Sequence, residues 1–227
     1  MCDLGRIVHL STDERVSNIC EGDFYVYYST FYEITFNSDG AGLSIKSSDK
    51  VYLEGNKFFK CVTESRGGGA YINGRNCTVF SCLATLCAAF SGFSIAIFGN
   101  DSNTVNYMTE VGCYSSSSGG HGGVYQYGVD GSTKNCNWTL SRSSYFIASS
   151  YPSFSRKLRL NFCLFERLNA PGAMSLHLNE NGDSVAESVC TINNTISSVE
   201  VFVQHVTNII RDGIFLDDKQ ICSTWYG

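Results

Sequence analysis

The feature that most constrains the fold of this chain is a short glycine-rich segment that recurs along most of the sequence, at intervals of about 26 residues. Its clearest copy is residues 67–72, GGGAYI, in which Gly69 is followed by the apolar residues Ala70 and Ile72. Apolar residues at alternate positions are typical of a β-strand with one buried face. The position of Gly69 is filled elsewhere by Gly42, Gly92, Gly123 and Ala173 (which follows Gly172), and more weakly by Ser153 and Ser198.

A second marker, usually a cysteine, precedes each glycine position by eight or ten residues. Because the two markers keep step, we expect the cysteines to occupy equivalent places in successive repeats and to stack in one internal column. Cysteine suits such a column because it is small, apolar and readily buried. Glycine at the later position would allow a bend with positive φ between two strands. The cysteines of the expected column are Cys61, Cys82, Cys113, Cys163 and Cys190.

These repeats predict an all-β solenoid, because units of roughly 20–31 residues with two short strands and no helical periodicity form one coil each. We expect a right-handed parallel β-helix of about seven to eight coils, stacked at the inter-strand spacing of roughly 4.8 Å. Residues 1–30 are expected to form an N-terminal cap or partial coil, residues 31–207 the repeats, and residues 208–227 a last partial coil that ends without a clear cap, as in a truncated chain. Asn73-Gly74 and Asp130-Gly131 are also favoured in β-hairpins, so an antiparallel roll is the alternative fold.

The motif Phe-x-Cys followed by Gly-Gly-Ala-Tyr-Ile, at residues 59–72, resembles the repeats of chlamydial polymorphic outer-membrane proteins and of related β-helix proteins from trichomonad protozoa. The resemblance covers roughly residues 31–207 and is closest at residues 68–70. Cysteine stands where the bacterial repeat prefers asparagine, which moves the likeness toward the protozoan group. The resemblance implies a pectin-lyase-like parallel β-helix used on cell surfaces for adhesion or display, with no catalytic residues to carry over.

Composition excludes some classes of function. A net charge of −5 and a pI near 5.3 argue against nucleic acid as a partner, because phosphate binding needs a positive surface. Most of the eleven cysteines are explained by the repeat rather than by a disulfide framework, and no CxxC pair indicates zinc. We expect no cofactor and no metal. No signal peptide and no membrane-spanning apolar run is visible, so the chain is either intracellular or a fragment of a longer surface protein.

The resemblance to pectin-lyase-like enzymes raises a polysaccharide hydrolase or lyase as an alternative function. Residues 120–122, Gly-His-Gly, resemble a polygalacturonase motif, but the repeat places His121 at the turn position of Gly67. Glu64 and Glu166 share one position of the repeat, yet four coils would separate them by about 19 Å, whereas glycosidase carboxyl groups lie about 5–9.5 Å apart. Asp217 and Asp218 are adjacent and would point to opposite faces of a strand. We therefore expect no catalytic residues.

A binding function has one candidate surface. Tyr71 and Tyr125 share a position of the repeat, and Tyr127 lies two residues later on the same face, with Lys60 expected nearby. These outward tyrosines would form a flat exposed patch for a carbohydrate or a cell-surface protein. The alternative is a purely structural spacer, in which they are ordinary solvent-facing strand residues.

Overall fold

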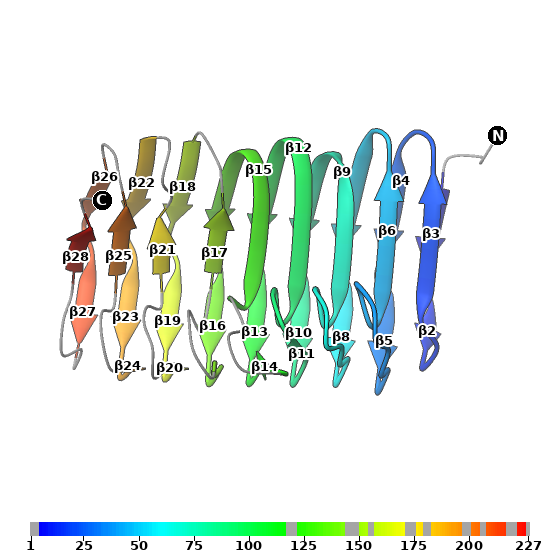
Figure 1. Ribbon diagram of the computed structural model, residues 1–227, viewed down its shortest axis with the longest axis horizontal. Helices are drawn as coiled ribbons and strands as arrows, with labels where there is room; N and C mark the ends of the chain where they lie inside the picture. The colour runs from blue at the N-terminus through cyan, green and yellow to red at the C-terminus, as the bar shows by residue number, and fades with distance from the viewer. Residues whose placement is uncertain are drawn as a thin grey trace.

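The computed structural model describes residues 5–116, 122–143, 150–153, 157–170, 176–178, 183–196, 201–204, 208–216 and 222–225. These residues form strands and no helix, and the strands pair in parallel (Figure 1). The parallel β-solenoid predicted from the repeat is confirmed. The antiparallel roll is wrong, because the same pairing runs from coil to coil along the molecule. The first and last described strands lie at opposite ends of the stack (Figure 1).

The larger sheet has 15 strands and consists of two adjacent ladders. In the middle of the stack a single long strand crosses both ladders; these strands are β9 (Ala70–Phe80), β12 (Ile95–Asn106) and β15 (Val124–Lys134). Elsewhere two shorter strands replace it. The first ladder contains β3 (Val16–Cys20), β6 (Leu43–Ser47), β17 (Ser150–Ser153), β21 (Leu176–Leu178), β25 (Val201–Gln204) and β28 (Cys222–Trp225). The second contains β1 (Gly5–Val8), β4 (Phe24–Tyr27), β7 (Lys50–Glu54), β18 (Lys157–Asn161), β22 (Asp183–Glu187) and β26 (Asn208–Arg211).

A second sheet closes each coil on the side away from the larger sheet. It has nine strands in sequence order, so the number of coils differs slightly from the seven to eight expected. Its strands are β2 (Ser11–Thr12), β5 (Thr30–Tyr32), β8 (Lys57–Phe59), β10 (Leu83–Thr85), β13 (Thr109–Val111), β16 (Asn137–Thr139), β19 (Leu164–Glu166), β23 (Cys190–Ile192) and β27 (Ile214–Leu216). Two short pairs, β11 (Ala88–Ala89) with β14 (Tyr114–Ser115) and β20 (Asn169–Ala170) with β24 (Thr195–Ile196), continue the coil.

The coils begin earlier than the sequence indicated. Strands β1, β2 and β3 pair in register with β4, β5 and β6, so the solenoid is already present from Gly5, inside the segment assigned to a cap or partial coil. At the other end, β26 and β27 extend the ladders beyond residue 207. Within the described residues no helix is long and apolar enough to cross a membrane.

A single left-handed residue makes each corner on either side of the smaller sheet. Lys60, with φ of 51°, and Leu86, with φ of 56°, are examples from successive coils. The Lys60 N–H donates to the Thr85 carbonyl one coil further on, at 2.9 Å, so the bent backbone still bonds to its neighbour. The other left-handed corner residues are His9, Tyr28, Glu33, Gly55, Ser81, Tyr107, Gly112, Asn135, Leu140, Phe162, Arg167, Ser188, Asn193 and Asp212.

The cysteines follow these corners in two columns, not one. Cys61 is in register with Cys87 and Cys113, because Val62 bridges Ala88 and Ala88 pairs with Tyr114. Cys82 belongs to the other corner and is in register with Asn56, as is shown by the pairing of Leu83 with Lys57. Cys136 and Cys163 lie in the same column as Cys82. All of these thiols are buried free cysteines, while Cys190 lies within β23, outside both columns, and is only partly buried.

The glycine register also needs correction at two positions, Gly92 and Ser153; Ser153 pairs with Tyr127 and so lies four residues past the equivalent of Gly123. Ala70 pairs with Leu43 and with Ile95, and Ile95 pairs with Val124. The residue equivalent to Gly42, Gly69 and Gly123 is therefore Ser94, and the assignment of Gly92 was wrong by two residues. A shift of two residues keeps each side chain on its face, so the predicted strand remained correct. Gly172, Ala173 and Ser198 lie outside the described residues.

Close approach, and not positive φ, explains why glycine recurs at this position of the repeat. A Cβ on Gly69 would lie 2.8 Å from the Phe58 side chain and 2.7 Å from the Ser94 carbonyl oxygen, and the residue has no left-handed φ. The positive φ is found two residues earlier, at Gly67 (70°), and at its equivalent Gly92 (62°).

Candidate binding surface

Aromatic side chains lie next to one another on the outer face of the first ladder. Tyr71 is in register with Ala96 and then with Tyr125, and Phe98 is in register with Tyr127. The predicted relation between Tyr71 and Tyr125 therefore holds, with one coil between them. We call Tyr71, Phe98, Tyr125 and Tyr127 the aromatic strip.

Phe98 joins the strip together. Its ring centroid lies 5.2 Å from that of Tyr71, 5.6 Å from that of Tyr125 and 5.4 Å from that of Tyr127. Such spacings are within the range of favourable ring contacts. Sequence reasoning missed Phe98 because the two-residue register error at Gly92 left it outside the expected strand pair. Its position two residues after Ala96 was the signal that would have found it.

The strip is not uniformly exposed, which corrects the expectation of a flat exposed patch. Tyr127 has 42% of its surface exposed, whereas Tyr71 has only 4%. Two cations cover Tyr71: the Arg66 guanidinium lies 5.2 Å from the ring centroid, and the Lys46 ammonium lies 6.0 Å from it. Arg66 also lies 4.8 Å from the Phe98 centroid. Burial raises the pKa of the Tyr71 hydroxyl. The exposed end of the strip is therefore the one at Tyr127.

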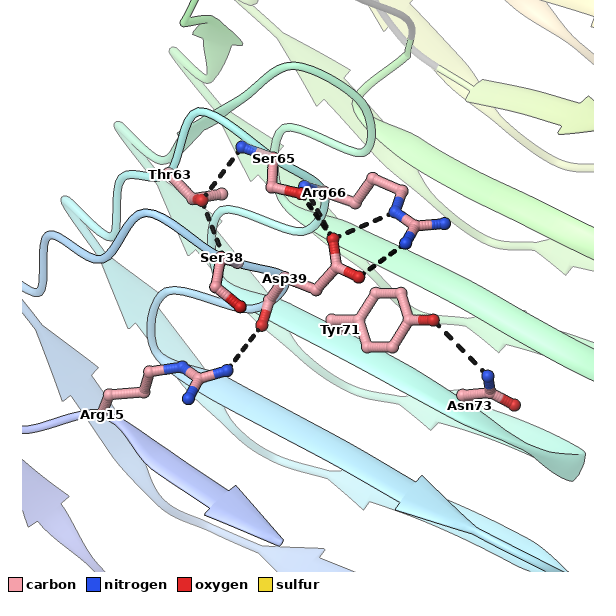
Figure 2. Close-up of polar contacts among 8 residues, drawn as sticks. All are labelled: Arg15, Ser38, Asp39, Thr63, Ser65, Arg66, Tyr71 and Asn73. Atoms are coloured by element: carbon pink, nitrogen blue, oxygen red, sulfur yellow. Dashed lines mark hydrogen bonds and ion pairs between the residues drawn. The ribbon is translucent and has the colours of Figure 1, made fainter. Parts of the chain in front are cut away.

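An ion pair holds Arg66 in this position (Figure 2). Arg66 Nη2 donates to Asp39 Oδ2 at 2.6 Å and Nε donates to Oδ1 at 3.0 Å, and the Ser65 hydroxyl donates to the same Oδ1 at 2.6 Å. Burial alone would raise the pKa of Asp39, but the hydrogen bonds and charge of Arg66, with the Ser65 bond, lower it. The pKa of Arg66 is raised, chiefly by its hydrogen bonds to Asp39. The pair is therefore charged on both sides.

Arg15, from the preceding coil, fixes the backbone of the same loop. Its Nε donates to the Gly40 carbonyl and its Nη2 to the Asp39 carbonyl, both at 2.8 Å. In the next coil the Thr63 hydroxyl donates to the Ser38 carbonyl at 2.8 Å. These bonds tie three coils together beside the strip (Figure 2), so the loop that holds the guanidinium over Tyr71 is bonded to the coils on both sides.

Lys60 does not belong to this surface. Its ammonium lies at a corner of the smaller sheet, 3.0 Å from Glu33 Oε1 and 5.0 Å from the Phe59 ring centroid. Lys46 and Arg66 are the cations that contact Tyr71.

The residues weighed for catalysis are not brought together. Glu166 pairs in register with Thr139, and through β13 and β10 with Phe59, so it does not share a position with Glu64, as the sequence had suggested. His121, Asp217 and Asp218 lie outside the described residues. Among the residues that are described, no group of three or more His, Cys, Asp or Glu side chains is placed to hold a metal ion.

The surface offers a ligand apolar ring faces and, at the edges of the tyrosine rings, polar hydroxyl groups. Asn73 Nδ2 donates to the Tyr71 hydroxyl at 3.4 Å, and the neighbouring cations already have ring or carboxylate partners. Tyrosine offers a large, rigid, amphipathic contact area at low entropic cost. The arrangement therefore supports binding by ring stacking and hydroxyl hydrogen bonds.

No protein-family model, no curated protein and no solved structure matches this chain.

Proposed function

We propose that this chain is a non-catalytic β-helix binding module that receives a carbohydrate chain on the aromatic strip. The observation that carries the proposal is the cluster of three rings from two adjacent strands, Phe98 with Tyr125 and Tyr127, at centroid distances of 5.6 and 5.4 Å. The apolar C–H face of a sugar ring stacks on an aromatic ring, while hydroxyl groups at the ring edges exchange hydrogen bonds with tyrosine.

The shape of the support favours an extended ligand over a small molecule. Small-molecule sites are usually concave and bury most of the ligand, whereas the strip lies on the outer face of a sheet built from repeating strands. Stacked repeats present extended surfaces along the solenoid, and a polymer of repeating sugar units matches that geometry. Use of such a module in surface display or adhesion follows from the resemblance of its repeats, and is part of the same proposal.

The proposal is tested by screening the intact protein against a glycan array and measuring the affinity of any glycan retained. Tyr127→Ala is expected to weaken binding about tenfold, which corresponds to about 1.4 kcal/mol. The matched control is Tyr32→Ala, because Tyr32 is a strand tyrosine of similar exposure, 37%, on the smaller sheet.

Two results would contradict the proposal. If no glycan is retained, the spacer interpretation is favoured; if both tyrosine variants weaken binding equally, the ligand does not use the strip.

A further inference from the structure

Glu110 is a carboxyl group enclosed in the interior of the solenoid. It is fully buried, with 0% of its surface exposed, in the middle of β13. The strand pairing places it directly between Ala84 of β10 and Trp138 of β16. No lysine, arginine or histidine is among the hydrogen-bond partners of its carboxyl group in the described residues; the partners of the carboxyl group are Ser94 and Ser141.

The hydrogen bonds around Glu110 fit a neutral carboxylic acid. The Ser94 hydroxyl lies 2.7 Å from Glu110 Oε2 and also 2.8 Å from the Gly123 carbonyl oxygen, while the Ser141 hydroxyl lies 2.7 Å from Oε1. A hydroxyl has one proton to donate. If Ser94 donates it to the Gly123 carbonyl, its oxygen accepts the proton of a protonated Glu110. Each hydroxyl then donates one hydrogen bond, whereas an ionised Glu110 would compete with the Gly123 carbonyl for the Ser94 hydroxyl proton; that carbonyl also accepts from the Ser94 N–H, at 2.9 Å.

Apart from the two hydroxyl groups, the described residues packed against the carboxyl group from neighbouring strands carry no charge. A Cβ on Gly123 would collide with the Glu110 carboxyl group, so this glycine makes the room that the carboxyl occupies. The described groups that lie around the Glu110 carboxyl are Ala84, Ser94, Gly123, Trp138, Ser141 and Cys113. Only Cys113 among them is titratable. Burial and the charge of the carboxylate raise the pKa of its thiol.

We propose that Glu110 is a proton-dependent latch of the coil interior, in which the neutral acid joins the segments of Ser94, Gly123 and Ser141, and loss of the proton leaves a buried charge that destabilises the coil. These segments belong to three consecutive passes of the chain. The first two lie directly before β12 and β15. The latch concerns stability and does not depend on the proposed carbohydrate binding.

The pH range follows from burial, which raises the pKa of Glu110 from 4.5 to about 7 against the opposing effect of the two serine hydrogen bonds. A group whose folded pKa is raised stabilises the fold fully below its unfolded pKa. That stability declines as the pH rises from about 4.5 and is lost once the pH passes about 7.

The first experiment measures the unfolding equilibrium in denaturant at pH 5, 6, 7 and 8 for the intact chain, for Glu110→Gln and for Glu64→Gln. Glutamine keeps the shape and hydrogen bonds of the neutral acid, because its amide donates to Ser94 and its carbonyl accepts from Ser141. Between pH 5 and 8 the intact chain is expected to lose on the order of 100-fold in its folding equilibrium relative to Glu110→Gln. Glu64 is exposed, and its variant should follow the intact chain. Parallel pH profiles for the intact chain and Glu110→Gln would overturn the proposal.

A second measurement needs no variant to fold. The infrared spectrum of the intact protein at pH 6 should contain the C=O stretching band of a buried carboxylic acid, and this band should disappear as the pH rises through about 7. If no such band is present at pH 6, Glu110 is ionised there and the latch does not exist.

Discussion

Two strands of the nine-stranded sheet, which we call rungs, fill the interior of their coils with different side chains. In β8 the inward residue is Phe58, whose ring stacks on Phe31 at 5.2 Å and 10° between planes. In β13, two coils further on, the equivalent inward position is Glu110. The first rung is held by apolar packing and the second by a network of hydroxyl hydrogen bonds.

The corner before β8 also contains a buried polar group, but one of another kind. The Asn56 Oδ1 accepts from the Ser29 N–H and its Nδ2 donates to the Val26 carbonyl, both at 2.9 Å. An asparagine amide does not titrate, so its hydrogen bonds to the backbone do not depend on pH. The comparison indicates that the solenoid admits buried polar side chains where each atom has a partner, and that the identity of the side chain decides whether the coil responds to protons.

The largest expected effect tests the apolar rung. Phe58→Ala removes the ring that stacks on Phe31 and should lower the free energy of unfolding by about 3–5 kcal/mol, as for other buried aromatic residues. Denaturant unfolding measures it. Phe59→Ala is the control, because Phe59 lies on the opposite face of the same strand and is 37% exposed. Equal losses would mean that the two faces were assigned wrongly.

Next in size is the amide of the same coil. Asn56→Ala leaves the Ser29 N–H and the Val26 carbonyl without their side-chain partner, at about 1–3 kcal/mol for an unsatisfied buried group. Cys82 occupies the same corner position one coil later and donates only a weak thiol bond to the Phe80 carbonyl, at 3.4 Å. Cys82→Ala should therefore destabilise less than Asn56→Ala in the same unfolding assay. A larger loss of stability in Cys82→Ala than in Asn56→Ala would contradict the view that the amide contributes more than the thiol at this corner.

A smaller loss of stability is expected when one hydrogen bond to Glu110 is removed. Ser141→Ala removes the hydroxyl that donates to Glu110 Oε1, and it is expected to lower stability by about 1 kcal/mol at pH 5. The loss should grow at pH 8, because hydrogen bonds to ionised groups are worth more. Unfolding curves at the two pH values measure the difference, and a loss that is independent of pH would show that the proton on Glu110 does not matter to this bond.

The smallest effect is expected on the outer face. Arg66→Ala breaks the pair with Asp39, whose side chains are 41% and 17% exposed, and partly exposed ion pairs contribute about 0.2–1 kcal/mol. Since the pKa of Asp39 is lowered in the fold, this contribution is present above the unfolded pKa of 3.8 and is lost as the pH falls through the folded value. That direction is opposite to the one expected for Glu110. Unfolding at pH 3 and pH 6, with Asp39→Asn as the matched variant, measures it; a loss that increases in acid would contradict the assignment.

The thiols provide a further check on the interior. Burial raises the pKa of Cys82 to about 12, and the pKa of Cys87 and Cys113 is also raised, chiefly by burial. Because the thiolate is the reactive form, these cysteines should not react with a thiol reagent until the chain unfolds. Mass spectrometry of labelled peptides, with and without denaturant, gives the answer. Rapid native labelling of Cys87 would place it outside the core.

The fold was predictable from the sequence because a parallel solenoid repeats its side chains in register, and the recurrent glycine and cysteine reported that register. The two cysteine columns were not separable, because both corners have the same local pattern: a left-handed residue followed by an inward side chain, which is a cysteine both in Lys60-Cys61 and in Ser81-Cys82. The slip at Gly92 went unnoticed for a related reason, since a period-two pattern looks the same after a shift of two residues.

The candidate site was only partly predictable. Tyr71, Tyr125 and Tyr127 were found because strand alternation assigns faces. The cover over Tyr71 was not, because Arg66 comes from the loop before the strand and its placement depends on Asp39, a full coil earlier. Glu110 had a signal in the sequence. It occupies the place, three residues before Cys113, that Phe58 occupies before Cys61, and reading that equivalence would have placed a carboxyl group inside the coil.

The one-residue corners determine where an insertion is tolerated. Strands β7 and β8 begin seven residues apart, at Lys50 and Lys57, and so do β22 and β23, at Asp183 and Cys190. In contrast, β9 begins 13 residues after β8, while β15 begins 15 residues after β13. An added residue between β7 and β8, or between β22 and β23, would place the inward side chains that follow it on the outer face. Foreign loops for display on such a scaffold should therefore be grafted into the arm that returns from the smaller sheet to the first ladder.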